Sequence, residues 1–373
     1  MNRVPPDNQG GFVLAVVLWS VAALTLITGG IVAKINSTLE QASSMRELVR
    51  SDQDAMATEQ TLLYLLSTHS QNEAGAQLAT NIGGLDKDEN KSTDPFAGRS
   101  SNEVEGPTLR FDGTWYQGIG DVSFSLQDAG ATLSLLEPER DTWLRAMSLL
   151  GLSADTASQW YDELLDYEDR DSLTRLNGAE KEGYRDQGLA PPPNRFPVTP
   201  FEIRNLPIAR QNPDVADDLI RSVTTGTGTM ANLNTSPPLM LELVHSMTRQ
   251  TAEKIVRDRK AHIIKSLMEA SSRYGVLFQG GQFQTSWQPS GYVRIMLGDR
   301  QGRHKRWIGV KFTATSNGAP WIIQYSHPVS FDHRPQEHNT KNAFSPNETT
   351  EAAPGADTWP YYSAFFPHQL SME

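Results

Sequence analysis

Cysteine is absent from this chain of 373 residues, which excludes a disulfide framework, a thiolate metal site and a thiol nucleophile. Positive charge is also in short supply, because 33 Lys and Arg face 44 Asp and Glu and leave a formal net charge of −11. Proteins that bind nucleic acid concentrate Lys and Arg, since phosphate contacts supply much of their affinity. The charge balance therefore argues against a nucleic-acid partner.

The short motifs that mark common enzyme classes are missing as well. The eight histidines never form His-Glu-x-x-His, and there is no Gly-x-Ser-x-Gly elbow. The pairs Gly118-x-Gly120 and Gly226-x-Gly228 lack the further residues of a phosphate-binding loop. We therefore expect that the protein is not an enzyme.

One apolar run stands near the N-terminus, and no second run approaches its length. Residues 12–33 contain no charged side chain, and roughly 20 apolar residues suffice for a helix to cross a bilayer. A secretory signal has a shorter apolar core of roughly 7–15 residues and ends in a small-residue cleavage site. We therefore expect a transmembrane helix at 12–33, with everything after Ala33 on one side. A plain single-pass anchor or an uncleaved signal anchor remains open at this point.

A polar segment without helix-breaking residues follows, because residues 35–70 contain neither Gly nor Pro. Apolar side chains recur in it every seven residues, which is typical of one buried face of a helix. We expect one long N-terminal helix over residues 12–82, whose second half buries this face against a following sheet. The face is formed by Ile35, Ala42, Val49, Met56 and Leu63.

Strand patterns begin in residues 108–127. Val122–Leu126 alternates apolar and polar side chains and predicts a half-buried strand. Leu109–Phe111 and Thr114–Tyr116 flank Asp112-Gly113, a dipeptide typical of hairpin turns. We therefore expect a hairpin here as part of an antiparallel sheet.

Helical patterns occupy residues 128–275, and the period returns to two in residues 276–331. Thr199 and Glu202 have the spacing of a capping box at a helix start. Because strand patterns flank the helical block, one sheet interrupted by an inserted domain explains the order better than two tandem domains. The later strands are expected at Phe283–Trp287, Tyr292–Leu297, Trp307–Thr313 and Trp321–Tyr325.

The predicted fold class is α+β. A long N-terminal transmembrane and amphipathic helix packs on a small antiparallel sheet, and a large all-α domain is inserted into that sheet. Residues 332–373 form a tail rich in Pro, Asn, Glu and Thr, which can bury little apolar surface. We expect this tail to be disordered.

The N-terminus resembles that of type IV prepilins and pseudopilins, whose short leader ends in Gly. In that family a membrane peptidase removes the leader, and the new N-terminal residue is methylated. The resemblance implies a leader at residues 1–11, cleavage between Gly11 and Phe12, and N-methylation of Phe12. Major subunits of the family carry Glu at the fifth mature position, where this chain has Val16.

The missing Glu is a property of the K-type minor pseudopilins of type II secretion, the general secretion pathway protein K family. The middle of the chain resembles the helical insert of that family in two segments. One is an aspartate-rich stretch followed by Gly-Ala-Glu, Tyr and Pro-Pro-Asn, and the other is Asn-Leu-Asn-Thr before Pro. The matching residues are Asp166, Tyr167, Asp169, Asp171, Gly178, Ala179, Glu180, Tyr184 and Pro192–Asn194, then Asn232–Thr235 and Pro237.

This resemblance implies the pseudopilin fold and a structural role. The chain would be a tip or initiation subunit of the periplasmic pseudopilus, which serves protein export across the outer membrane. It would sit in the inner membrane by a single span, with its body in the periplasm. The implied partners are the I-type and J-type minor pseudopilins, the prepilin peptidase and the inner-membrane secretion platform.

An acidic stretch at residues 162–186 holds nine carboxylates against four cations, which gives 4 − 9 = −5. Ca²⁺ takes six to eight oxygen ligands, and the K-type family binds calcium in its large domain. The resemblance thus favours a calcium site at Asp166, Asp169, Asp171 and Glu180. The spacing is not that of an EF-hand loop, and charge runs are more often solvated surfaces. Two alternatives therefore stay open: that the chain has no cofactor, and that it binds Ca²⁺.

Two other functions fit parts of the sequence. A minor pilin of another type IV filament, for adhesion or DNA uptake, would share the N-terminal features. The Asn232–Thr235 segment also resembles helix-hairpin-helix units that bind DNA backbones, which would make the chain a DNA-binding membrane protein. The acidic surroundings of that segment disfavour this last alternative.

Overall fold

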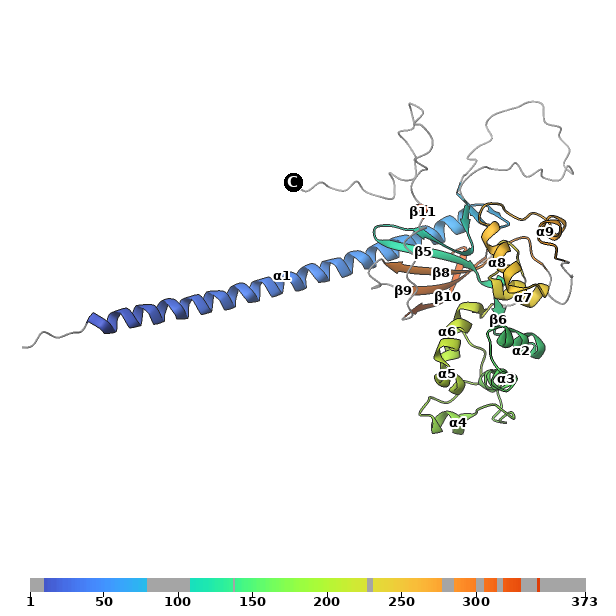
Figure 1. The fold of residues 1–373 in the computed structure, drawn as a ribbon, viewed down its shortest axis with the longest axis horizontal. Coiled ribbons are helices and arrows are strands. Elements are labelled where there is room, and N and C mark those ends of the chain that lie inside the picture. The colour runs from blue at the N-terminus through green and yellow to red at the C-terminus, as the bar shows by residue number, and fades with distance from the viewer. Residues whose placement is uncertain are drawn as a thin grey trace, which may run out of the picture.

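The computed structural model describes residues 10–78, 108–136, 138–226, 231–276, 285–299, 305–313, 318–329 and 341–342. A 59-residue helix, α1 (Gly10–Thr68), dominates its outline and projects far beyond the rest of the molecule (Figure 1). Its N-terminal part has a mean hydropathy of 2.2 over an 18-residue window, and none of that window is buried. α1 is thus long and apolar enough to cross a membrane.

α1 ends at Thr68, not near residue 82 as the sequence pattern had predicted. The carboxamide Oδ1 of Asn72 accepts hydrogen bonds from the backbone N–H groups of Ala74 at 2.9 Å and Gly75 at 3.0 Å. This side-chain turn competes with helical hydrogen bonds and reverses the chain. The reversal produces the strands β1 (Gln71–Asn72) and β2 (Gly75–Gln77), which pair antiparallel.

The main sheet has six strands in the order β10-β9-β8-β5-β4-β11. All neighbours pair antiparallel except β11 and β4, which are parallel. The bounds are β4 (Asp112–Gln117), β5 (Val122–Asp128), β8 (Tyr292–Asp299), β9 (Lys305–Phe312), β10 (Trp321–Pro328) and β11 (Lys341–Asn342). Apart from β11, the predicted tail 332–373 lies outside the described residues.

The hairpin predicted across Asp112-Gly113 is wrong. β3 (Thr108–Arg110) pairs with β2, whereas β4 pairs with β5. Asp112 and Gly113 lie inside β4, where the register against β5 shifts between Asp112 and Trp115. Gly113 has φ 84° in this bulge, a conformation that favours glycine. A bulge and a hairpin turn both need such a residue, so the dipeptide alone does not separate them.

One face of the sheet packs on the C-terminal part of α1. Leu62, Leu63 and Leu66 of the helix join Phe124, Leu126 and their strand neighbours in one buried cluster. α1 spans about 88 Å at 1.5 Å per residue, whereas an eight-residue strand spans about 26 Å. The sheet can therefore cover only the end of the helix. The predicted burial holds at Leu63 and is wrong for the rest of the heptad face, Ile35, Ala42, Val49 and Met56.

The opposite face of the sheet carries the inserted helices. β5 confirms the strand predicted at Val122–Leu126, but all seven of its residues are buried, so the predicted half burial is wrong. Trp307, Met296 and Tyr325 of this face pack into the cluster formed by the insert. A strand with alternating apolar and polar side chains is predicted to be half-exposed, because the sequence does not show whether another element covers its polar face.

The insert runs between β5 and β8 and contains two helical clusters (Figure 1). The first joins α2 to α6 and includes Met240 and Leu243 of α7, and the second joins Leu241 of α7 to α8 and α9. A short parallel pair, β6 (Leu133–Ser134) with β7 (Val223–Thr224), lies within it. The helices are α2 (Arg140–Leu149), α3 (Ala154–Glu168), α4 (Lys181–Asp186), α5 (Pro207–Gln211), α6 (Pro213–Ser222), α7 (Pro238–His245), α8 (Arg249–Asp258) and α9 (Leu267–Tyr274), with 3-10 turns η1 (Ala129–Ala131) and η2 (Pro200–Asn205).

The predicted fold class is confirmed: the protein is α+β, with a long helix on an antiparallel sheet that a helical insert interrupts. The strands predicted at 292–297, 307–313 and 321–325 correspond to β8, β9 and β10. The strand predicted at Phe283–Trp287 is wrong where it can be judged, because Thr285–Trp287 is irregular and residues 283–284 lie outside the described part.

Candidate functional site

α1 leaves a long apolar surface uncovered beyond its membrane-length run. Leu39 is 62% exposed and Met45 is 64% exposed, although both lie on the polar half of the helix. Exposed apolar patches of this extent on a soluble surface mark interaction sites. The geometry of α1 thus offers a packing surface both inside a membrane and beyond it.

The residues predicted for processing lie at the start of α1. The backbone of Gly11 and Phe12 belongs to its first turns, and the side chain of Phe12 lies outside the described part of the structure. The leader, residues 1–9, also lies outside it. Val16 faces outward on the helix with 47% of its surface exposed.

Three of the four predicted calcium ligands meet in the structure. Carboxylate oxygens of Asp169, Asp171 and Glu180 all lie within 4.8 Å of one another. Asp169 is the C-cap of α3, and Glu180 is the N-cap of α4, so the loop between the two helices brings them together. We call these three residues the acidic cluster.

Asp166, the fourth predicted ligand, is committed to Arg175. Its Oδ1 lies 2.5 Å from Arg175 Nη1, and its Oδ2 accepts the backbone N–H of Arg175 at 3.2 Å. A Cβ on residue 178 would lie 2.0 Å from Asp166 Oδ2, which explains the glycine in Gly178-Ala179-Glu180. Asp166 therefore holds the loop in place.

The chemistry of the acidic cluster fits a hard cation. Asp169 Oδ1 and Glu180 Oε1 are buried without a hydrogen-bond partner, which is costly unless another group compensates. Burial raises the pKa of Glu180, and the carboxylates of Asp166, Asp169 and Asp171 raise it further. A divalent cation bound by oxygen ligands would relieve both the repulsion and the missing bonds.

Arg175 is a residue of this site that the sequence pattern did not single out. Its Nη1 also lies 2.5 Å from Asp169 Oδ2, so it neutralises part of the negative charge. The pattern Arg-x-x-Gly, which follows an aspartate-rich helix end, could have identified Arg175 as a site residue. A loop arginine pairing back to the helix would have explained why so many carboxylates tolerate one another.

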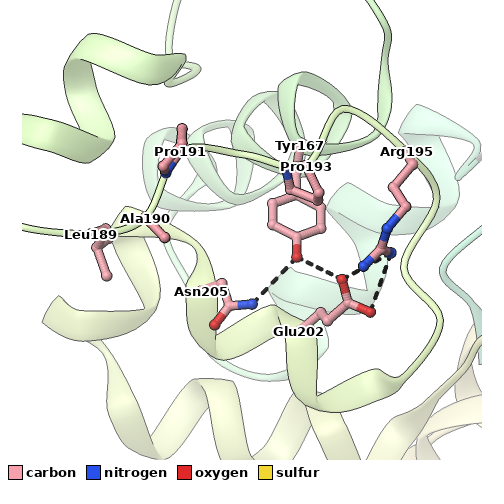
Figure 2. Close-up of a pocket in the computed structure, with 8 residues that line it drawn as sticks. All are labelled: Tyr167, Leu189, Ala190, Pro191, Pro193, Arg195, Glu202 and Asn205. Carbon is pink, nitrogen blue, oxygen red and sulfur yellow. Dashed lines mark hydrogen bonds and ion pairs between the residues drawn. The ribbon is translucent and has the colours of Figure 1, made fainter.

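A hollow of about 350 Å³ lies beside the same helix end, and Figure 2 shows the residues that line it. The hydroxyl of Tyr167 donates to Glu202 Oε2 at 2.6 Å and accepts from Asn205 Nδ2 at 3.3 Å. Arg195 pairs with Glu202 at 3.1 Å. Burial, and then the bond to Glu202, raise the pKa of Tyr167, so the hydroxyl stays protonated at neutral pH.

Glu202 in this hollow has a structural role that the sequence predicted. Its Oε1 accepts the backbone N–H groups of Val198 at 2.8 Å and Thr199 at 3.3 Å, which completes the capping box at η2. The carboxylate is therefore used by the fold, and the hollow offers an apolar wall more than a reactive group.

The Asn-Leu-Asn-Thr segment anchors the insert to the rest of the body. No residue of this segment is more than 1% exposed, which holds for Asn232, Leu233, Asn234 and Thr235. Asn234 Oδ1 accepts from Ile264 N at 2.8 Å, and Thr235 Oγ1 donates to Asp128 Oδ2 at 3.0 Å. A segment so enclosed has no surface that could contact a DNA backbone.

Two fully buried arginines complete this anchoring, and neither was predicted from the residue pattern. Arg294 of β8 donates to Arg221 O at 3.0 Å and to Val223 O, at the C-terminal end of α6. Arg259 donates to Leu233 O at 3.1 Å and to Ser236 O at 2.6 Å. Long basic side chains usually lie on the surface, so their burial depends on carbonyl groups that distant segments supply.

No protein-family model matches this chain, and no curated protein matches its sequence. Among solved structures, it is similar to a chain in the crystal structure of the GspK–GspI–GspJ complex from the type 2 secretion system of enterotoxigenic Escherichia coli. The match has a TM-score of 0.48 and 13% sequence identity, and it covers 78% of this chain and 100% of that one. A likeness of this size does not by itself say what the present chain does.

Proposed function

We propose that the chain is a K-type minor pseudopilin of type II secretion, acting as a structural tip or initiation subunit of the periplasmic pseudopilus. The observation that carries the proposal is the topology: an exposed apolar helix packs on a sheet that a helical domain interrupts between β5 and β8. The same insert contains the two sequence segments that resemble the K-type family. In this role the chain performs no catalysis.

The uncovered surface of α1 supports assembly through this helix. Its membrane-length run would hold the precursor in the inner membrane, with the body in the periplasm. After cleavage between Gly11 and Phe12 and methylation of Phe12, the helix would pack against the helices of I-type and J-type minor pseudopilins. Burying apolar surface is worth roughly 25 cal/mol per Å², so a helix this long has ample driving force. The prepilin peptidase and the inner-membrane secretion platform are the further proposed partners.

Two features favour a position at the tip: the absence of Glu at the fifth mature position, and the bulk of the helical insert. In major subunits a Glu at the fifth mature position is thought to neutralise the N-terminal amine of a neighbour, and a buried unpaired charge is expensive. Val16 offers no such partner to a subunit stacked above. The first helical cluster of the insert packs on the face of the sheet away from α1, and α7 to α9 lie near the C-terminal end of α1 (Figure 1), so the insert adds bulk that a stacked subunit would meet.

Co-expression tests the proposal directly. The full chain is produced with a prepilin peptidase and with I-type and J-type minor pseudopilins, beside a Gly11→Leu variant that blocks the proposed cut. We expect mass spectrometry to find a mature chain that begins at methylated Phe12, and affinity purification of the body to retain both partners. The Gly11→Leu chain should keep its leader almost completely.

The outcomes separate the competing functions. Processing at Phe12 without retention of either partner would favour a minor pilin of another type IV filament, for adhesion or DNA uptake. A mature chain that still begins at Met1 would refute the pseudopilin assignment. The remaining interpretation would then be a plain membrane anchor.

We also propose that the acidic cluster holds Ca²⁺, as the donor set of Asp169, Asp171 and Glu180 suggests. The ion would join α3 to α4 and order the loop between them. At a concentration about 100 times its Kd, a ligand that binds only the folded state adds about 2.7 kcal/mol. For a domain of this size that raises the melting temperature by roughly 5–10 °C.

Asp171→Asn should abolish most of this calcium-dependent rise in melting temperature, whereas Glu182→Gln, an exposed carboxylate on the adjacent helix, should preserve it. Differential scanning calorimetry of the intact chain with EDTA, Ca²⁺ or Mg²⁺ provides the measurement. Equal melting temperatures in EDTA and in millimolar Ca²⁺ would rule the site out.

A further inference from the structure

One edge of the main sheet is open within the described part of the chain. β10 (Trp321–Pro328) is the outermost strand there, with β9 on its inner side (Figure 1). The opposite edge is closed in part, because β11 pairs with Tyr116 and Gln117 of β4. An edge strand presents backbone N–H and C=O groups that a strand of another chain can bind. β10 is therefore the edge at which another protein can extend the sheet.

The hydrogen bonds of β9 show which way its residues face. The N–H of Phe312 donates to the carbonyl of Gly291, just before β8, at 2.9 Å. The N–H of Thr313 donates to the carbonyl of Pro320, just before β10, at 3.0 Å. The hydrogen-bonding groups of successive strand residues point to alternate sides. The even-numbered residues of β9 therefore bond to β8, and the odd-numbered ones bond to β10.

The same alternation identifies the outward-facing groups of β10. Ile323 lies opposite Val310, and Ser326 lies opposite Ile308. Both partners in β9 are even-numbered and bond to β8, so these two positions are non-hydrogen-bonded pairs between β9 and β10. The N–H and C=O groups of Ile323 and Ser326 therefore point away from β9, toward the open edge.

β10 lacks the charged side chains that commonly protect an edge strand. Ile322 and Ile323 are 47% and 44% exposed, and they lie on opposite faces of the sheet. Two other protective features are present, a bulge between Ile323 and Tyr325 and a proline at the end of the strand, Pro328. A bulge interrupts a ladder and a proline cannot donate to it. An added strand can therefore pair with β10 only over a short stretch.

The exposed heptad face of α1 begins on the same side of the helix as β10. Thr58 Oγ1 accepts the N–H of Ile119, in the turn between β4 and β5, at 3.0 Å. Glu59 pairs with Arg306 of β9. One residue corresponds to a rotation of about 100°, so the rotation from Thr58 to Glu59 leads from the β4 side of α1 to the β9 side. Met56, three residues earlier, lies about 60° further in this direction.

A helix packed on this face lies on the side of the open edge. Met56 is 61% exposed and Val49 is 50% exposed, and each heptad toward Ile35 rotates the face by about 20° more. α1 packs on β5 and β8, and β10 lies two strands beyond β8, at about 10 Å given the usual strand spacing. Packed helices lie about 8–10 Å apart. A partner helix against Met56 and Val49 therefore places the rest of its protein beside β10.

We propose that the partner whose helix packs on α1 also adds an extended strand to the outer edge of β10, next to Ile323 and Ser326. The added strand is apolar where it meets Ile323, because an apolar side chain there buries the exposed isoleucine. This inference rests on the proposed function and extends it, since main-chain hydrogen bonds join the bodies of the two proteins in addition to the contact between their helices. It also assigns the partner to the β10 side of the chain.

Two substitutions on the edge test this contact, with the full chain purified in detergent and titrated with dye-labelled I-type and J-type minor pseudopilins. Ser326→Pro removes an outward-facing N–H at a kind of position where edge strands tolerate proline. Ile323→Lys adds a charge to the edge. We expect each variant to weaken the binding of one of these partners at least 10-fold, as measured by fluorescence anisotropy. Met268→Lys, at a residue that is 83% exposed on α9, is the matched control and should leave binding unchanged.

Photo-cross-linking locates the partner independently. The chain has no cysteine, so one introduced cysteine can carry a benzophenone maleimide. Ile323→Cys lies on the open edge, whereas Asp121→Cys lies in the exposed turn between β4 and β5, on the other side of α1. We expect Ile323→Cys, and not Asp121→Cys, to cross-link to the partner. This measurement decides the proposal even where Ser326→Pro lowers the melting temperature.

Unchanged affinity for both edge variants would overturn the proposal, as would cross-links from Asp121→Cys and none from Ile323→Cys. If the unaltered chain retains its partners in that case, the proposed function stands and this inference alone fails. The absence of any binding by the unaltered chain would refute both.

Discussion

Replacing Arg259 with methionine should lower the free energy of unfolding by about 3–5 kcal/mol, the usual cost of removing one partner from a buried ion pair. Arg259 is 1% exposed and joins three parts of the chain. It donates to the carbonyls of Leu233 and Ser236 and lies 3.7 Å from Asp112 Oδ2 in β4. Methionine fills a similar volume but leaves both carbonyls without this donor.

The effect should also depend on pH. Burial pushes the pKa of Asp112 upward, but Arg259 and Arg110 outweigh it and hold the pKa below its ordinary value. A lowered carboxyl pKa contributes stability above the pKa of the unfolded chain, and that contribution is lost as the pH falls through the folded value. The deficit of the variant should therefore be largest near neutral pH and shrink in acid.

Denaturant titration of the intact chain, followed by tryptophan fluorescence, measures the change. Arg257→Met is the control in α8, of which Arg259 is the C-cap, because the Arg257 side chain is 66% exposed and its pairing with Glu253 is 4.0 Å long. That substitution should cost about 0.5 kcal/mol or less. Equal losses for Arg257 and Arg259 would mean that the buried arginine does not join the insert to the sheet.

Replacing Leu63 with alanine should cost about 2–5 kcal/mol, the range for large-to-small changes in a closed core. Leu63 is 1% exposed in the cluster that joins α1 to the sheet. Leucine and alanine are both good helix formers, so the loss reflects packing and not helix formation. The expected consequence is weaker attachment of the C-terminal part of α1.

Leu39→Ala gives the matched control in the same helix. Leu39 is 62% exposed, so its truncation should leave the unfolding free energy unchanged. If α1 packs with partner helices as proposed, the same variant should weaken co-purification with them. A large stability loss at Leu39, or none at Leu63, would contradict the placement of the sheet on the end of the helix.

Most of the secondary structure could be predicted from the sequence, since it depends on short-range patterns. The absence of Gly and Pro from residues 35–70 predicted an unbroken helix, and the change of period at residue 128 predicted the insert. The spacing of Thr199 and Glu202 predicted the capping box, because the contacts of a capping box span only three residues. These features are decided within one or two turns of chain.

The candidate site could be predicted only in part. The composition of residues 162–186 marked a concentration of carboxylates, but not which of them converge. Asp166 and Asp169 are one helical turn apart, and Arg175 forms ion pairs with both of them. The choice depended on the path of the loop back to α3, which no local pattern encodes.

Local patterns in the chain were enough to predict a membrane-length helix that continues into a polar one, and a helical block between two groups of strands. The folded chain was needed to show that the sheet covers only the end of α1, that Asp112-Gly113 forms a bulge, and that Arg259 and Arg294 are buried. The two sets of features differ in the distance along the chain over which their interactions act. Helical and strand periods reflect neighbours a few residues away, whereas a buried charge or a covered sheet face depends on groups that only the folded chain brings within reach.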